Sequence, residues 1–131
     1  MLTSLSIRDV VLIETLDLDF SSGLGVLTGE TGAGKSILLD ALGLALGDRA
    51  DSGLVRSGAT QASVTASFRL PNAAKALLDS NDLVVGAGEE LIVRRTVKAD
   101  GGSRAYVNDQ PVSAALLREL GGLLVEIHGQ H

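Results

Sequence analysis

Apolar and polar residues alternate in three stretches of the chain, and each alternation predicts a strand with one buried face. Residues 4–8 and 15–20 follow each other closely, which predicts an antiparallel pair. Residues 62–69 carry the clearest alternation. Residues 91–97 and 104–107 flank a turn rich in glycine and aspartate, so they predict the two strands of a hairpin. The pattern therefore predicts antiparallel pairing in two places.

A segment with a different pattern lies between these strands. Residues 36–46 are apolar on almost every side and rich in helix-forming residues, which predicts a buried helix. Gly47 stands where that helix is expected to end. A short apolar run at residues 24–27 precedes it and predicts a buried strand. A shorter helix is predicted at residues 73–78, because Pro71 ends the strand before it.

The last part of the chain combines a helix signal with another apolar run. Ser113 can cap a helix that runs to about Leu120, and Gly121 with Gly122 is typical of a helix end. Residues 123–127 then predict a final, buried strand. Strands and helices that follow one another in this way predict an α/β fold.

The segment between the predicted strand at 24–27 and the buried helix matches the phosphate-binding pattern G-x-x-x-x-G-K-[ST]. Its glycines let successive backbone N–H groups point at phosphate oxygens, and the start of the helix adds the positive end of its dipole. Lys35 can reach the β- and γ-phosphates, and Ser36 can place its hydroxyl on Mg²⁺. The predicted nucleotide-binding residues are Gly29, Glu30, Thr31, Gly32, Ala33, Gly34, Lys35 and Ser36.

Composition limits the possible classes of protein. The 131 residues make one domain or part of one, and 45% of them are apolar, which is enough for a packed core. With only 2% aromatic residues the core must be aliphatic. The lack of cysteine excludes disulfides and thiolate metal sites. No long apolar segment predicts a membrane span and no secretory signal is evident, so a cytoplasmic location is expected.

Charge argues against a general electrostatic attraction to nucleic acid, because the net charge is −5. Four basic residues nevertheless fall within eleven positions, and they are Arg94, Arg95, Lys98 and Arg104. We interpret them as a solvated strand face, with a local basic patch as the alternative.

The remaining motifs separate the classes that share a phosphate loop. The single Asp-x-x-Gly, residues 40–43, lies inside the predicted helix, and no lysine follows an asparagine, so a GTPase is disfavoured. A small-molecule kinase stays open, with Arg94 and Arg95 as candidate lid arginines. A nucleotide-gated interaction module, in which binding rather than turnover is the output, also stays open.

Further residues carry a resemblance to ABC-type ATPases, and within them to the N-terminal part of an SMC-like head. These are the phosphate loop with Ile37–Ala41, Leu46–Arg49, Val93–Asn108 and Val125–His131. The resemblance implies an α/β fold with a mixed sheet around the phosphate loop and an antiparallel β subdomain. It implies that residues 1–131 run from the phosphate loop to the glutamine loop, with the coiled coil and the C-terminal half of the head outside them.

The same resemblance implies ATP and Mg²⁺ as ligands. Gln130 is then the glutamine that contacts Mg²⁺, or its bound water, and reports nucleotide state, while Ser36 is the second magnesium residue. Arg56 falls where such heads carry an arginine near nucleotide or DNA. The implied partners are the C-terminal half of the same head, a second head joined by ATP, and DNA. The implied role is recombinational repair of double-strand breaks at the bacterial nucleoid.

Hydrolysis needs groups that this chain does not supply. There is no Leu-Ser-Gly-Gly signature and no acidic pair after an apolar strand. Only three apolar residues precede Glu126, so we do not assign it as the catalytic carboxylate. Residues 1–131 alone are therefore expected to be inactive, and to expose an apolar face to the missing half. Adenine recognition is unassigned, because Phe20 is predicted on the core face, and His128 with His131 does not make a zinc site.

Overall fold

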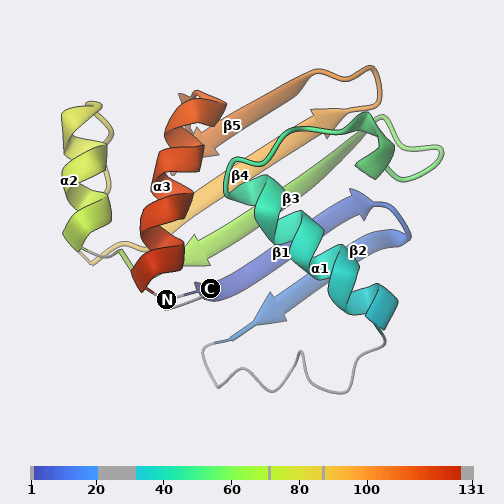
Figure 1. Ribbon diagram of the computed structural model, residues 1–131, viewed down its shortest axis with the longest axis horizontal. Helices are drawn as coiled ribbons and strands as arrows, with labels where there is room; N and C mark the ends of the chain where they lie inside the picture. Colours follow the sequence, from blue (N-terminus) through green and yellow to red (C-terminus); the bar gives the residue numbers. More distant parts are fainter. Residues whose placement is uncertain (1, 21–31, 71, 87, 128–131) are drawn as a thin grey trace.

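Six strands form one sheet, and the helices α1 and α3 lie across one of its faces (Figure 1). The computed structural model describes residues 2–20, 32–70, 72–86 and 88–127, with the backbone alone at 32–36 and 125–127. Its elements are β1 (Leu2–Val10), β2 (Ile13–Asp19), α1 (Gly32–Ala45), the 3₁₀ turn η2 (Ser52–Leu54), β3 (Gln61–Phe68), α2 (Asn72–Ser80), β4 (Leu91–Lys98), β5 (Ser103–Val107), β6 (Gln110–Val112) and α3 (Ala114–Ile127).

The strand order is β2-β1-β3-β4-β5-β6, and all pairings between these strands are antiparallel. The predicted early pair is confirmed, with Leu5 opposite Leu18 and Ile7 opposite Leu16. The predicted hairpin of β4 and β5 is confirmed as well. The α/β class with an antiparallel sheet is therefore confirmed. The strand predicted at residues 24–27, where the mixed part of the sheet is expected, lies outside the described residues.

The core lies between the sheet and the helices. Because side chains alternate along a strand, β3 and β4 each place every second residue on this inner face. Helix α1 crosses the sheet over β1, β3 and β4, as Figure 1 shows. Its buried positions recur at helical spacing. The inner-face residues include Leu5, Ile7, Val64, Ala66, Leu91, Val93, Val97, Val107 and, from α1, Leu38, Ala41, Leu44 and Ala45.

The turn between β1 and β2 is strained and is held by the loop that follows α1. Val11 has φ +51°, which is rare for a β-branched residue, and its N–H donates to the Leu54 carbonyl at 2.8 Å. Leu12 is 82% exposed. The apolar run Val10–Ile13 is therefore not one continuous strand, because the chain reverses at Val11 and Leu12.

Strand β6 was missed by the sequence analysis. It has three residues and contains Pro111, which cannot donate to a sheet ladder, so its strand signal is weak. The turn before it has positive φ at both Asn108 (46°) and Asp109 (66°), which is the geometry of a two-residue hairpin. The Asn108 side chain also holds β4, because its Oδ1 accepts from the Ile92 N–H at 2.9 Å.

The predicted strand at residues 123–127 is wrong, because α3 continues through it to Ile127. The Ser113 cap is confirmed, since its Oγ accepts from the Leu116 N–H at 3.0 Å. Gly121 and Gly122 do not end the helix. Leu117, Leu120 and Leu124 are all buried, and their spacing keeps one apolar face along it.

Candidate nucleotide-binding site

The second half of the predicted phosphate loop forms the start of α1. Gly32–Ser36 are the first residues of this 14-residue helix, so Lys35 and Ser36 belong to its first turns. A helix of this length has unpaired backbone N–H groups at its start, which favour an anion there. The other three predicted residues of the loop, Gly29 to Thr31, lie outside the described residues.

The far end of α1 is closed by a glycine, as predicted. Gly47 has φ +102°, and its N–H donates to the Leu44 carbonyl at 3.2 Å. The Asp48 N–H donates to the Gly43 carbonyl at 3.0 Å, which completes a Schellman motif. A residue with a side chain would be strained at this φ. The end of the helix is therefore specified locally.

Arg95 holds the same end of α1 from the sheet. It is 2% exposed, and its guanidinium donates to the Leu44 carbonyl at 3.2 Å and to the Asp48 carbonyl at 3.0 Å. A cation beside the last carbonyls of a helix is favourable. Burial lowers the pKa of Arg95, the charge of Arg118 lowers it further, and Asp48 opposes this shift. Arg95 therefore ties the phosphate-loop helix to β4.

The four clustered basic residues do not form one face. Arg95 shares its face of β4 with Leu91, Val93 and Val97, and this alternation was readable in the sequence. Arg94 points to the other face, where its guanidinium lies 4.3 Å from the Tyr106 ring centre and 3.8 Å from an Asp109 oxygen. The solvated-face interpretation is therefore correct for Arg94, Lys98 and Arg104 and wrong for Arg95.

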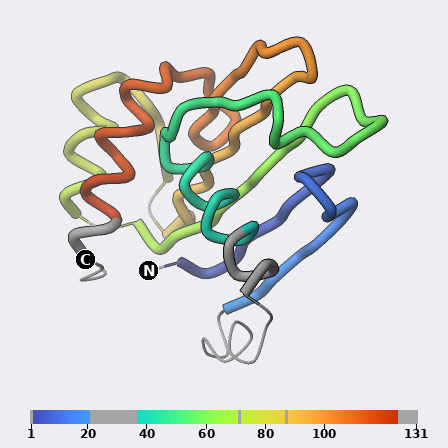
Figure 2. The backbone as a smooth tube through the Cα atoms, turned by 45° about the vertical axis from the view of Figure 1, so that its right-hand side comes forward, coloured from blue at the N-terminus to red at the C-terminus, as the bar shows by residue number. Residues whose placement is uncertain are grey.

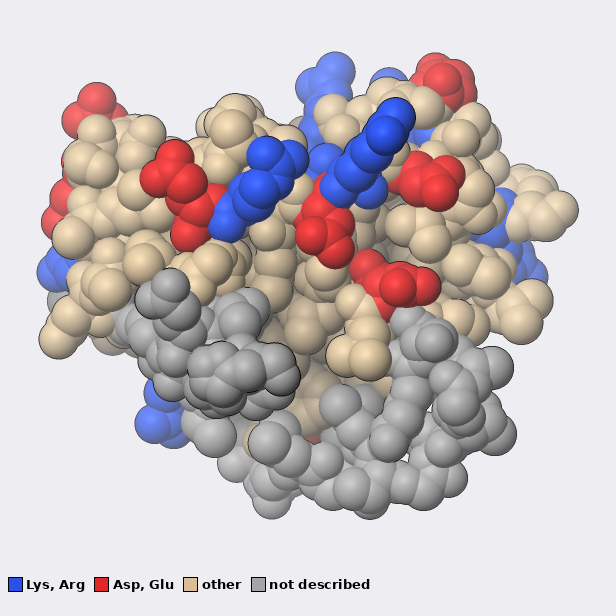
Figure 3. Space-filling model, viewed as in Figure 1, with Lys and Arg blue, Asp and Glu red and all other residues tan. Residues whose placement is uncertain are grey.

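The burial of Arg95 also weakens the kinase alternative, because a side chain held by two backbone carbonyls is not free to serve as a lid arginine. On the helix-covered side of the molecule, basic and acidic side chains alternate rather than gather by sign (Figure 3). On this side, the residues coloured in Figure 3 form no patch that is basic alone or acidic alone.

Arg56 lies against the β1–β2 hairpin. Its N–H donates to the Asp9 carbonyl at 2.8 Å, and its guanidinium is 4.0 Å from the Asp9 carboxylate. Its suggested position near nucleotide or DNA stays a prediction.

The structure describes only some of the other predicted residues. Gln130, His128 and His131 lie outside the described residues. Glu126 lies on α3 and not at the end of a strand, so the outline that suggested a catalytic carboxylate is absent. Within the described ranges, no group of three or more His, Cys, Asp or Glu residues could hold a metal ion.

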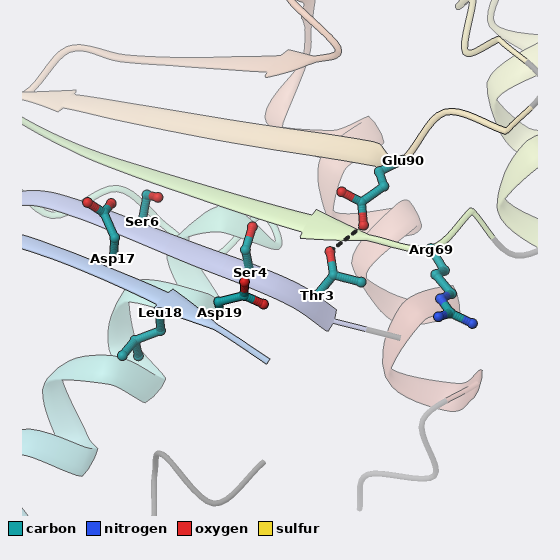
Figure 4. Close-up of a pocket in the computed structure, with 8 residues that line it drawn as sticks. All are labelled: Thr3, Ser4, Ser6, Asp17, Leu18, Asp19, Arg69 and Glu90. Atoms are coloured by element: carbon teal, nitrogen blue, oxygen red, sulfur yellow. Dashed lines mark hydrogen bonds between the residues drawn. The ribbon is translucent and has the colours of Figure 1, made fainter. Parts of the chain in front are cut away.

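A hollow on the outer face of the sheet does not suit a nucleotide. Thr3, Ser4 and Ser6 of β1 and Asp17 and Asp19 of β2 contribute to it, as Figure 4 shows. Glu90 lines it too and accepts a hydrogen bond from the Thr3 hydroxyl at 2.6 Å. Against one cation, Arg69, three carboxylates leave the lining with an excess of negative charge, which disfavours phosphate.

Large apolar side chains that are exposed in the described part of the chain are scattered. Leu12, Leu39, Val84 and Ile92 come from the hairpin turn, α1, the loop before β4 and β4 itself. Leu39 matters most for the site, because it is 66% exposed on the phosphate-loop helix. In the same described part, no helix is long and apolar enough to cross a membrane.

Comparisons with known proteins agree with this geometry. Over its whole length the chain is 46% identical to the DNA repair protein RecN of Vibrio cholerae and 44% identical to that of Xylella fastidiosa. It spans 24% of the length of each relative, and it corresponds to their N-terminal segment.

The fold is that of an SMC-type head. A solved structure described as "Structural biochemistry of ATP-driven dimerization and DNA stimulated activation of SMC ATPases" superposes with a TM-score of 0.71 at 20% identity. The match covers 99% of this chain and 80% of that one. A family model described as an AAA domain matches residues 4–120. With that match over most of its length, the chain belongs to the AAA domain family.

Proposed function

We propose that this chain binds ATP with Mg²⁺ and forms the N-terminal half of an SMC-like ATPase head that acts in recombinational repair of DNA double-strand breaks. The observation that carries the proposal is the position of Gly32–Ser36 at the start of α1, with one face of the rest of that helix buried on the sheet. Similarity to RecN over the whole chain supports the repair role.

The proposed binding residues are those of the phosphate loop and Gln130. Backbone N–H groups from Gly29 to Gly34 cradle the phosphates, and Lys35 neutralises the β- and γ-phosphates. Ser36 and Gln130 hold Mg²⁺, which supplies charge neutralisation between the two terminal phosphates when it is bound. The burial of Leu38, Ala41 and Ala45 fixes one face of α1 against the sheet, which supports a defined direction for its first turn.

Completion of the head requires the C-terminal half. None of the described residues supplies a carboxylate at the end of an apolar strand, so we expect activation of water to come from that half. The proposal has three further parts. A second head joins this one through ATP, the whole protein binds DNA, and it acts in the cytoplasm at the nucleoid.

The test is ATPase activity of this chain with and without the C-terminal segment, with Lys35→Ala as the variant. We expect turnover only in the combined protein, and its loss in Lys35→Ala, because the lysine contacts the phosphates that separate. Arg94→Ala is the control, because Arg94 lies on the outer face of β4. Equal turnover by the chain alone would contradict the split head. Phosphate transfer to a small acceptor would favour the kinase, and ATP-driven association without turnover would favour the interaction module.

A further inference from the structure

The end of α1 and the middle of α3 meet backbone to backbone. A Cβ atom on Gly121 would lie 2.6 Å from the carbonyl oxygen of Leu46, and one on Gly47 would lie 2.5 Å from the nitrogen of Arg118. Both distances are shorter than a side-chain carbon allows, so glycine is required at each position. Leu46, Gly47, Arg118 and Gly121 together are called the α1–α3 joint below.

Gly122 differs from its neighbour. A Cβ atom there would have no heavy atom within 4 Å, and the residue is exposed, whereas Gly121 is buried. Glycine costs a helix interior about 1 kcal/mol relative to alanine. The cost at Gly121 is offset by a close approach that a larger residue would prevent.

Arg95 adds the sheet to the joint. Two of its hydrogen bonds reach the Leu44 and Asp48 carbonyls, which flank Leu46 and Gly47 in sequence, and a third reaches the Ser103 hydroxyl at 3.4 Å. Its Nε is buried and has no hydrogen-bond partner. An unpaired buried donor is costly, so the remaining bonds of this guanidinium depend on the end of α1 staying in place. Arg95 therefore fixes the joint against β4.

The two helices diverge from the joint toward the same edge of the molecule, as Figures 1 and 2 show from two directions. Helix α1 begins at that edge with Gly32, and α3 ends there at Ile127. At a rise of about 1.5 Å per residue, Ile127 lies roughly 9 Å along α3 from Gly121. A tilt at the joint is thus carried to both ends.

We infer that the α1–α3 joint, fixed by Arg95, transmits nucleotide binding at the start of α1 to α3. The inference rests on the proposed function, because it needs nucleotide at the phosphate loop. Arg95 is a positioning residue, since it holds the end of α1 opposite Gly32.

The test combines calorimetric titration with ATP and Mg²⁺ and hydrogen exchange of the α3 amides, in the chain extended to the length of its relatives. We expect ATP to slow exchange along α3. Gly121→Ala should reduce this slowing roughly fivefold or more, as for a typical coupling between sites, while ATP still binds. Gly122→Ala is the matched control, because it makes the same change in helix propensity without a clash, and it should leave the slowing unchanged.

A second pair keeps the test decisive if Gly121→Ala fails to fold. Arg95→Met removes the donor to both carbonyls, so it should reduce the ATP effect on α3, whereas Arg94→Met on the outer face should not. Unchanged exchange in α3 of the wild type despite bound ATP would overturn the inference, as would equal effects of the paired variants. No calorimetric binding of ATP to the wild type would instead refute the proposed function.

Discussion

The two faces of the sheet have different chemistry although the same strands build them. The inner face is aliphatic and covered by α1 and α3, and its one buried charged side chain among the described residues is Arg95. The outer face carries hydroxyl groups and charges. Its residues include Ser4, Ser6, Arg8, Asp17, Ser63, Thr65, Arg94, Thr96, Lys98 and Arg104, which follow from the strand register.

Adjacent arginines show what this difference means. Arg94 stacks on Tyr106 at the surface, and Arg95, one residue later, is buried with its guanidinium on carbonyls at the end of α1. Since successive side chains of a strand point to opposite faces, position in the alternation decides the role more than residue type does. The inner face therefore positions the phosphate-loop helix, while the outer face carries the polar and charged side chains.

The largest difference between the faces is expected from Leu91 and Ile92. Leu91 is 0% exposed and Ile92 is 39% exposed. Leu91→Ala should lower the free energy of unfolding by about 3 kcal/mol, because it removes buried contacts and leaves a cavity. Ile92→Ala should lower it by less than about 1 kcal/mol. Urea denaturation of both variants measures this, and equal losses would mean that the outer face is also covered.

A smaller difference is expected from the two arginines. Arg95→Met should lower the free energy of unfolding by about 2 kcal/mol, because it removes the hydrogen bonds of the guanidinium to the Leu44 and Asp48 carbonyls. Arg94→Met should lower it by about 0.5 kcal/mol, since a half-exposed cation–π contact is worth little. The denaturant midpoints of Arg95→Met and Arg94→Met measure this difference in stability. If Arg95→Met left the free energy of unfolding unchanged, the hydrogen bonds of Arg95 to the two carbonyls would only balance the cost of burying its charge.

The smallest effect is expected on the outer face, where Arg8 and Asp17 lie 2.9 Å apart. The Arg8 hydrogen bond lowers the pKa of Asp17 below its usual 3.8, and Ser6 contributes. A lowered pKa stabilises the fold above the unfolded value and loses that effect as pH falls through the folded value. Asp17→Asn should therefore lower the melting temperature slightly near neutral pH and not in strong acid. A difference that persists in an Arg8→Ala background would contradict the pairing.

Most of the fold was predictable because its signals are local. The alternation at β1, β3 and β4 predicts each strand and its buried face, and Gly47 correctly predicts the end of α1. The end of α3 was not predictable in the same way. Gly121 resembles a helix stop in sequence. Its actual role is to let the backbone of Leu46, 75 positions earlier, lie close to its Cα.

For the candidate site, the pattern predicts a helix from residue 36, at the end of the phosphate loop, and the backbone of α1 begins earlier, at Gly32. The prediction of a solvated face is wrong at Arg95. The alternation predicts a strand there, but it also assigns each residue to one face of that strand, and this second use decides the burial of Arg95. Strand β6 was not predicted, because three residues with a proline carry little signal. Its pairing with β5 and the hydrogen bonds of the Gln110 side chain to Val84 stabilise it.

The sequence by itself determined the phosphate loop, the antiparallel strands and an aliphatic core, because these follow from backbone propensity and from which residues avoid water. Only the tertiary structure decided which arginine is buried, that α3 passes through two glycines, and that α1 and α3 touch at one point. Those features depend on contacts between residues far apart in the chain, and local patterns carry no record of such contacts.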